Sequence, residues 1–364
     1  MPFSYEWRVL RIAIASLLLL AACDDDAVDC DAPGVLCTIV GTGLAGNAGI
    51  ADGLPPLQSE LYLPVDVAFD AQGDLLVVDF NNHAIRRLHD GVLQTIIGTG
   101  YLGDHVDGPA RQTGLKHPTH VTTLADGTLA VAGWHDPRIL HYDPVSDTVV
   151  SWCGTGERGF DGDGHAADAT ELNLPVATAT DMNGRLLIAD QGNQRVRRVE
   201  ADGTVSTIVG TGVAGYGGDG GPAVDAQIAS PQNQDGAPAG KIARGPDGTL
   251  YLADTLNQVV RAVSPDGIIR TVVTPALSTP SDVAVDPQGR LYIADTFSSC
   301  VRMIDPDGTA TTVAGRCGER GYTGDGGPAD RALLDRPYGI ELDVQRRLWI
   351  ADTHNNVIRR VQLP

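Results

Sequence analysis

Six copies of one sequence pattern run along the chain and constrain its fold more than any other feature. The copies open at Pro64, Pro118, Pro175, Pro238, Pro280 and Pro337, the fourth more loosely than the rest. A period of about 40 to 60 residues is typical of propellers and solenoids. Each copy alternates short apolar runs with Gly and Pro turns and has no helical period, which predicts four short antiparallel strands. One such sheet cannot bury both of its faces, whereas six sheets around an axis bury each other. The repeat therefore predicts an all-β, six-bladed β-propeller with four-stranded antiparallel blades.

The two ends of the chain complement each other. The last repeat has three apolar runs and lacks a fourth, and the missing run is found near the start as Thr38-Ile-Val-Gly-Thr-Gly43. This segment matches the fourth runs that begin at Thr95 and Thr207. We expect residues 38–43 to form the outer strand of the last blade, which closes the ring without an exposed sheet edge.

The first residues have the pattern of an export signal. Arg8 and Arg11 precede an apolar run, Ile12 to Ala22, that is shorter than the roughly 20 residues of a membrane span. Leu20-Ala-Ala-Cys23 resembles the lipobox of bacterial lipoproteins, which implies cleavage before Cys23 and a lipid on its thiol. The alternative is an ordinary signal peptide with a cysteine there by chance. We expect a signal peptide at 1–22, an acidic tether at 23–36 and the propeller at 37–364. The location is then the bacterial cell envelope, lipid-anchored and extracytoplasmic.

Recurrent short motifs point to a family. Ala-Asp-Thr-x-Asn begins at Ala253 and Ala351, an Arg follows in most repeats, and Gly-Asp-Gly-Gly-Pro-Ala begins at Gly218 and Gly324. These motifs resemble the NHL-repeat family of six-bladed propellers, of the bacterial lipoprotein type, over nearly all of the chain from Thr38 onward. We interpret the motif residues as scaffold. The Asp should accept from backbone N–H groups of the turn that follows it, and the Arg should link strands or blades.

The second repeat departs from the motif. It has Gly133, Asp136 and Leu140 in place of the Asp, Asn and Arg. Either this blade is less firmly held or its loops are adapted to a ligand.

Five cysteines follow Cys23, and an exported protein can form disulfides. Cys30 and Cys37 are one candidate pair, and Cys300 and Cys317 are another, although spacing alone does not determine the connectivity. Cys153 falls at a strand position and is expected to be a buried free thiol.

The chain is strongly acidic, with 46 Asp and Glu against 26 Lys and Arg. Nucleic-acid binding requires a basic surface, so we expect no nucleic-acid partner. The charge favours cationic partners or divalent metals.

The resemblance leaves two classes of function open. Amidating lyases and gluconolactonase-like hydrolases share the six-bladed design and hold a metal at the mouth of the central channel. In this chain the second residue after each opening Pro reads Asp66, His120, Ala177, Gly240, Asp282 and Gly339. Asp66, His120 and Asp282 are therefore candidate ligands of a divalent cation. In the alternative interpretation the two carboxylates accept backbone hydrogen bonds and His120 lines a wet channel.

A second metal candidate is the loop Phe160-Asp-Gly-Asp-Gly-His165, which has the first spacing of a calcium loop but not the rest. We assign no cofactor and no catalytic residue.

Binding is the function that the sequence favours. The long connections between repeats should gather on one face, where loops on a rigid scaffold bind ligands. These connections are Tyr101–His117, Glu157–Leu174, Val213–Pro238 and Glu319–Arg336. We expect a scaffold that binds a protein, peptide or glycan rather than an enzyme. The alternative is a metal-dependent lyase or lactonase-like enzyme that uses Asp66, His120 and Asp282. The sequence leaves the identity of the ligand and the oligomeric state open.

Overall fold

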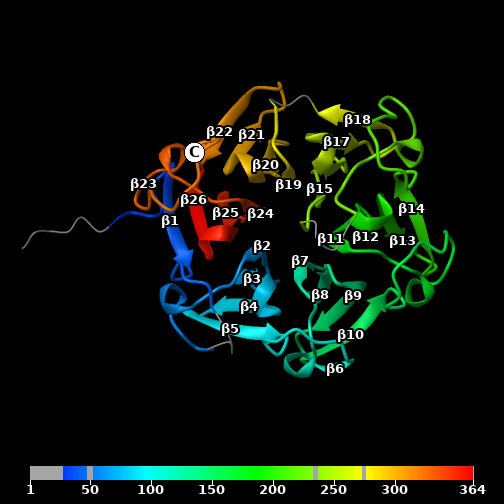
Figure 1. The fold of residues 1–364 in the computed structure, drawn as a ribbon, viewed down its shortest axis with the longest axis horizontal. Helices are drawn as coiled ribbons and strands as arrows, with labels where there is room; N and C mark the ends of the chain where they lie inside the picture. Colours follow the sequence, from blue (N-terminus) through cyan, green and yellow to red (C-terminus); the bar gives the residue numbers. More distant parts are fainter. Residues whose placement is uncertain (1–27, 47–51, 233–236, 273–275, 364) are drawn as a thin grey trace, which may run out of the picture.

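The computed structural model describes residues 28–46, 52–232, 237–272 and 276–363. The predicted signal peptide and Cys23 lie outside these residues. Six antiparallel sheets surround a central axis, which confirms the predicted six-bladed propeller (Figure 1). No described helix is long and apolar enough to span a bilayer.

Each blade runs from an inner strand at the axis to an outer strand at the rim. In chain order the blades consist of β2 to β5 (Pro64–Phe69, Leu75–Asp79, Ala84–His89, Val92–Ile97), β7 to β10 (Pro118–Thr123, Leu129–Gly133, Asp136–Asp143, Thr148–Cys153), β11 to β14 (Pro175–Thr180, Leu186–Asp190, Arg195–Val199, Val205–Val209), β15 to β18 (Ile242–Arg244, Leu250–Asp254, Val259–Val263, Ile269–Val272), β19 to β22 (Pro280–Val285, Leu291–Asp295, Cys300–Ile304, Ala310–Ala314) and β24 to β26 (Pro337–Leu342, Arg347–Asp352, Val357–Gln362).

The sixth blade is completed by the N-terminal segment. Strand β1 (Val35–Val40) pairs antiparallel with β26, so the first described strand lies beside the last (Figure 1). The strand begins before the predicted residue 38 and ends before Gly41, because Gly41 has φ +106° and turns the chain. A Cβ at Gly41 would lie 2.5 Å from the carbonyl oxygen of Asn356, so only glycine fits. Two-residue strands β6 (Gly108–Pro109) and β23 (Gly327–Pro328) extend the second and sixth sheets.

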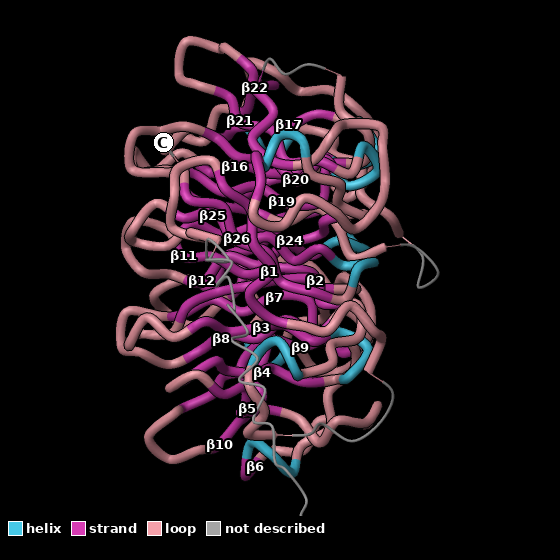
Figure 2. Tube along the Cα trace, turned by 90° about the vertical axis from the view of Figure 1, so that its left-hand side faces the viewer, coloured by secondary structure: helices cyan, strands magenta, loops and turns pink. Residues whose placement is uncertain are grey.

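The two faces of the ring differ. The connections from outer strands to the next inner strands lie on one face, together with the turns between second and third strands, and all of them except the one between β18 and β19 are long. Short 3-10 helices form in both kinds of connection and gather toward this face (Figure 2). They are η1 (Pro56–Gln58), η2 (Phe80–Asn82), η3 (Ala110–Gln112), η4 (Ala167–Ala169), η5 (Gln191–Asn193), η6 (Ala223–Asp225), η7 (Thr255–Asn257), η8 (Thr296–Ser298), η9 (Ala329–Arg331) and η10 (Thr353–Asn355). We call this the long-loop face, and the opposite one, where first and second strands are joined, the short-turn face.

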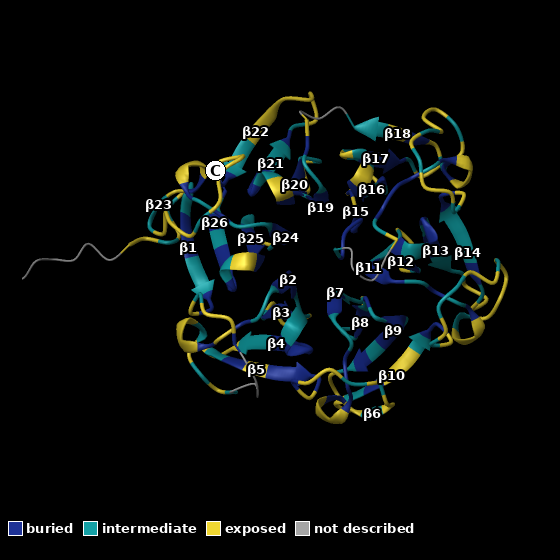
Figure 3. Ribbon diagram, in the orientation of Figure 1, coloured by how far each residue is buried: buried dark blue, intermediate teal, exposed yellow. Residues whose placement is uncertain are grey.

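The core lies between the blades rather than at the axis. Buried residues follow the strands, and exposed ones concentrate at the rim and in the loops (Figure 3). Val78 and Ile85 of the first blade, for example, pack in one cluster with Val131 and Leu140 of the second. Each interface therefore buries the face that a single blade would leave exposed.

The motif carboxylates have structural roles, but not with the predicted partners. Asp254 accepts a hydrogen bond from the N–H of Ala229, in the loop that enters its own blade, rather than from the following turn. The reason is that strand β16 ends beside the start of its own inner strand. Asn257 and Arg261 both donate to the same carboxylate, and Arg261 also donates to the carbonyl of Gly217. The Arg thus ties a strand to the long loop.

The second blade differs locally where its motif differs. Between β8 and β9 the short helix of the other blades is replaced by a turn of Trp134 and His135. Asp136 is buried and pairs with Arg138, 2.9 Å away.

Disulfides join Cys30 to Cys37 and Cys300 to Cys317. The first links the segment before β1 to the strand itself. Cys153 is a buried free thiol, and burial raises its pKa to about 12.

Candidate functional site

The strand registers revise the set of residues that face the axis. Ile242 pairs with Leu252 in the fourth blade, as Val67 pairs with Val77 in the first. The residue equivalent to Asp66 is therefore Lys241, and the predicted Gly240 is wrong by one position. The fourth repeat opens at Ala239 rather than Pro238, and the loose match at Pro238 concealed this shift. The chain has only two lysines, and one of them stands at the axis.

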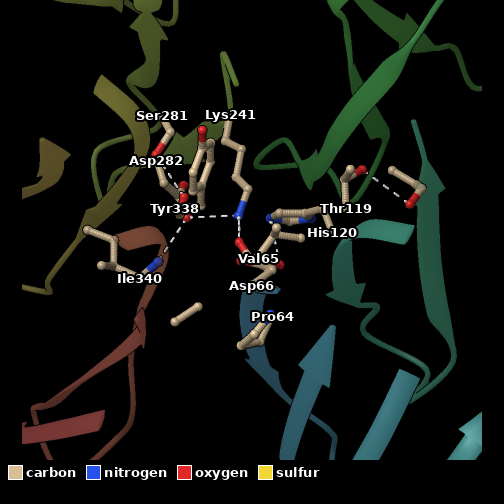
Figure 4. A network of polar contacts seen from close by, with 12 residues as sticks. Pro64, Val65, Asp66, Thr119, His120, Lys241, Ser281, Asp282, Tyr338 and Ile340 are labelled. Carbon is tan, nitrogen blue, oxygen red and sulfur yellow. Dashed lines mark hydrogen bonds and ion pairs between the residues drawn. The ribbon is translucent and has the colours of Figure 1, made fainter. Parts of the chain in front are cut away.

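Lys241 joins two of the three predicted side chains. Its ammonium group donates to Asp66 Oδ1 at 2.7 Å, to Asp282 Oδ2 at 3.2 Å and to the carbonyl of Val65 at 3.0 Å (Figure 4). The side chains of Lys241, Asp66 and Asp282 are all at least 96% buried. The ammonium group thus lies between carboxylates of the first and fifth blades.

His120 extends this contact network. Its Nε2 lies 3.8 Å from Asp66 Oδ2, and its Nδ1 accepts from the N–H of Thr178 in the third blade. On the other side Asp282 Oδ2 accepts from the N–H of Ile340 in the sixth blade. One chain of polar contacts therefore passes through all six blades, and we call it the axial network.

Burial controls the protonation of the axial network. It raises the pKa of Asp66 and Asp282, and the charge of Lys241 opposes that rise. Burial alone would lower the pKa of Lys241, but the two carboxylates raise it above its ordinary value. Burial, with the charge of Lys241, lowers the pKa of His120 to about 3. His120 is therefore neutral at neutral pH, and since Nδ1 accepts, its proton is on Nε2 and faces Asp66.

The axial network does not suit a divalent metal. Asp66, His120 and Asp282 do converge, but the ammonium group of Lys241 lies where a cation would sit and already neutralises one of the carboxylates. Among the described residues no group of three His, Cys, Asp or Glu side chains has metal-binding geometry. In the calcium candidate, Asp163 accepts from Arg197 and Thr207, so that carboxylate is already bound to the scaffold.

A cavity of about 750 Å³ leads along the axis from the short-turn face to the axial network. Inner strands of all six blades line it. His120 and Asp282 lie at its deep end, Thr122, Thr178 and Glu341 are in its walls, and the turns at 70–73 and 343–345 surround its opening. The cavity contains His120 and Asp282 of the candidate channel site, and it opens on the face opposite to the long connections, where we also expected a ligand to bind.

Glu341 is a residue of this cavity that the sequence did not single out. It follows Ile340 on β24, is half-buried, and accepts from the N–H of Leu342 through Oε1. Burial, with the charges of Asp282 and Asp66, raises its pKa to about 8. The sequence did contain a signal that could have identified Glu341. It is a Glu at a position where other repeats have a small residue, such as Ala68 and Ala284.

The repeats match a known family. The family model described as NHL repeat matches residues 61–88 and 277–302, in the first and fifth blades. The chain is an NHL-repeat propeller.

Among curated proteins, this NHL-repeat propeller is similar to Protein SUPPRESSOR OF QUENCHING 1, chloroplastic, of Arabidopsis thaliana. The identity is 30% over 159 residues, which is 44% of this chain and 14% of that protein. It is also similar to Teneurin-m of Drosophila melanogaster, at 27% over 165 residues, 42% of this chain and 6% of that protein. The chain therefore spans a small part of the curated relatives it matches.

Solved structures share the fold. An auxiliary nutrient binding protein from Bacteroides thetaiotaomicron superposes with a TM-score of 0.63 at 16% identity, over 90% of this chain and 75% of that one. Virginiamycin B lyase from Staphylococcus aureus superposes with a TM-score of 0.50 at 12% identity, over 81% of this chain and 78% of that one. At these identities the likeness concerns the fold alone, which hosts binding proteins and enzymes alike.

Proposed function

We propose that this NHL-repeat propeller is an extracytoplasmic, lipid-anchored binding protein whose axial cavity holds a small polar ligand. The cavity carries the proposal. Its volume of about 750 Å³ lies within the range of small-ligand sites, roughly 300–1,000 Å³. Its walls are inner strands of a closed ring, so the site is formed before a ligand arrives.

The polar groups in the cavity favour binding over metal chemistry. Thr122 supplies a hydroxyl group, which also lies 2.8 Å from the hydroxyl of buried Thr178, and His120 supplies a neutral ring. The metal-dependent lyase or lactonase alternative has one observation in its favour, the convergence of Asp66, His120 and Asp282. Lys241 weakens it, because a divalent ion would have to displace a buried ammonium group from two carboxylates. The fold likeness to both a nutrient-binding protein and a lyase is compatible with either function.

The ligand site is tested by filling the cavity. Lipid-free wild-type protein is dialysed against a defined mixture of sugars, amino acids, amino alcohols and organic acids, and retained compounds are identified by mass spectrometry. We expect Thr122→Trp, which places a large ring in the cavity, to lose the retained compound. Thr311→Trp, on the exposed outer strand β22, is the matched control and should keep it. Retention of the compound by the Thr122→Trp protein would show that the cavity is not the site.

The lipid anchor remains a proposal based on the sequence around Cys23. In a bacterial host, the wild-type chain should fractionate with membranes and be released by detergent. Cys23→Ala should appear in the soluble extracytoplasmic fraction. A Cys23→Ala protein that still requires detergent for release would contradict the anchor.

A further inference from the structure

The deep end of the cavity holds more acidic than basic groups. Asp282 and Glu341 line it together with His120. The charges of Asp282 and Asp66 both raise the pKa of Glu341, and the charge of Lys241 opposes that rise. His120 is neutral. Asp66 and Asp282 share Lys241 directly, whereas Glu341 forms no ion pair among the described residues.

One carboxylate oxygen in this region also has unused hydrogen-bonding capacity. Asp66 is 1% exposed, and its Oδ2 makes no hydrogen bond within the described part of the chain. His120 Nε2 lies 3.8 Å from this oxygen, which is too far for a hydrogen bond. The backbone N–H groups of Val67 and Val121 also act on this carboxyl group and lower its pKa. Because buried acceptors without a donor are costly, Asp66 Oδ2 would be stabilised by one further donor.

Cations nearer the opening are already engaged. Arg244 donates to the carbonyl of Thr180, and Arg347 pairs with Asp343. They leave Glu341 without a guanidinium partner and compensate charge at the opening rather than at the deep end.

We propose that the axial cavity binds a small organic cation and that the carboxyl group of Glu341 receives its ammonium group. The inference rests on the proposed function, because it specifies the ligand class of the same cavity. The threonine hydroxyls of the walls suit a ligand that also carries hydroxyl groups. The acidic surface of the whole chain would concentrate such a cation near the opening.

Binding of a cation would be coupled to loss of a proton. Burial raises the pKa of Glu341 to about 8, so the group is mostly protonated at pH 7. The charges of Asp282 and Asp66 add to this rise, whereas the N–H of Leu342 and the charge of Lys241 oppose it. An ammonium group favours the ionised carboxyl, so its arrival releases the proton to solvent. Affinity for a cation should therefore rise as the pH increases toward about 8, while an alkylammonium ligand, like lysine with its pKa of about 10.4, stays charged.

Three probes with one carbon skeleton isolate the charge: glucamine is cationic, sorbitol neutral and gluconate anionic. Their binding to the wild-type protein is measured by calorimetry at pH 7 in two buffers of different ionisation enthalpy. We expect glucamine to bind about tenfold or more tightly than sorbitol, as one charge-assisted hydrogen bond provides. Its apparent binding enthalpy should change with the buffer in the sense of proton release. Gluconate should bind most weakly.

Glu341→Gln keeps the shape of the side chain and prevents it from ionising. This variant should lose the preference for glucamine over sorbitol and the proton release. Glu157→Gln makes the same substitution at an exposed position in a loop of the opposite face and should keep both. Equal binding of sorbitol and glucamine, or an unchanged preference in Glu341→Gln, would overturn the inference.

The two proposals can fail separately. If the dialysis experiment finds a neutral or anionic compound that Thr122→Trp excludes, the cavity is a binding site and only the ammonium inference is wrong. If no probe binds and dialysis retains nothing, both proposals are wrong.

Discussion

At the scale of single residues, Lys241 joins the side chains of the axial network at the deep end of the cavity. Its ammonium group is buried between carboxylates contributed by β2 and β19, far apart in the sequence. A buried charge is tolerated only when it is paired and hydrogen-bonded, and each of these three groups depends on the others for that. Gly339 has a related role, since a Cβ there would lie 2.4 Å from the carbonyl oxygen of Val65. The absence of a side chain at this position lets the first and sixth blades approach each other.

Lys241→Met should be strongly destabilising. The substitution keeps most of the side-chain volume but leaves the carboxylates of Asp66 and Asp282 buried without their cation, at a cost of about 3–5 kcal/mol. Urea unfolding at pH 7 measures the loss. Lys116→Met is the matched control, because Lys116 is partly exposed and pairs with exposed Asp104, and it should cost less than about 1 kcal/mol. Equal stability of the two variants would contradict the structural role of the axial network.

Sequence reasoning found Asp66, His120 and Asp282 but not the residue between them. The repeat pattern places equivalent residues at the axis because the inner strand of every blade pairs with its second strand in the same register. It failed in the fourth blade, where the opening is displaced by one residue and Gly240 was counted in place of Lys241. Glu341 was not predicted as a site residue for another reason. Whether a residue of the cavity wall faces the cavity depends on how the six blades are arranged around the axis, and no single repeat contains that information.

At the scale of elements, the repeat predicted the strands well because each is bounded by Gly, Pro or Asp turns. It also predicted the closing strand, since the missing fourth run of the last repeat had a counterpart near Thr38. The partners of the motif side chains were harder to foresee. Asp254 contacts a residue 25 positions earlier, and such a contact follows from the blade's geometry rather than from local turn chemistry.

Removing the closing strand tests its contribution. Leu36 and Val40 of β1 are fully buried, so deletion through Gly43 should cost about 3–6 kcal/mol from these two side chains alone. The melting temperature should fall markedly. A chain that starts at Val28, and so retains Cys30 and β1, is the control and should melt like the mature protein. An unchanged melting temperature after deletion through Gly43 would show that the strand does not hold the ring closed.

At the scale of the whole molecule, buried acids make stability depend on pH in an unusual direction. Burial raises the pKa of Asp352 to about 7 and that of Glu341 to about 8. A carboxyl with a raised pKa stabilises the fold at pH values below its ordinary pKa, and this contribution is lost as the pH rises toward the folded-state value. Burial lowers the pKa of His117 to about 4 and that of His120 to about 3, so their effect is confined to pH values below about 6.5.

The free energy of unfolding should therefore decrease between pH 6.5 and 8.5, the interval in which Asp352 and Glu341 lose their protons in the folded protein. Urea midpoints at the two pH values measure this decrease. In Glu341→Gln the decrease should be smaller, because the carboxyl with a pKa of about 8 is no longer present to titrate. Stability that stays constant or rises over this interval would contradict the assignment of these carboxyls as neutral in the folded protein.

The axial network also bears on how such a ring can change over generations. A chain of sequence repeats can gain or lose a copy by slippage, since neighbouring copies are alike. At the axis, however, the copies have become individual: an acid, a histidine, an alanine, a lysine, a second acid and a glycine follow each other around the ring. Exchanging, duplicating or reordering blades would separate the lysine from its acids. The contacts of Lys241 with Asp66 and Asp282 therefore depend on the present number and order of the blades.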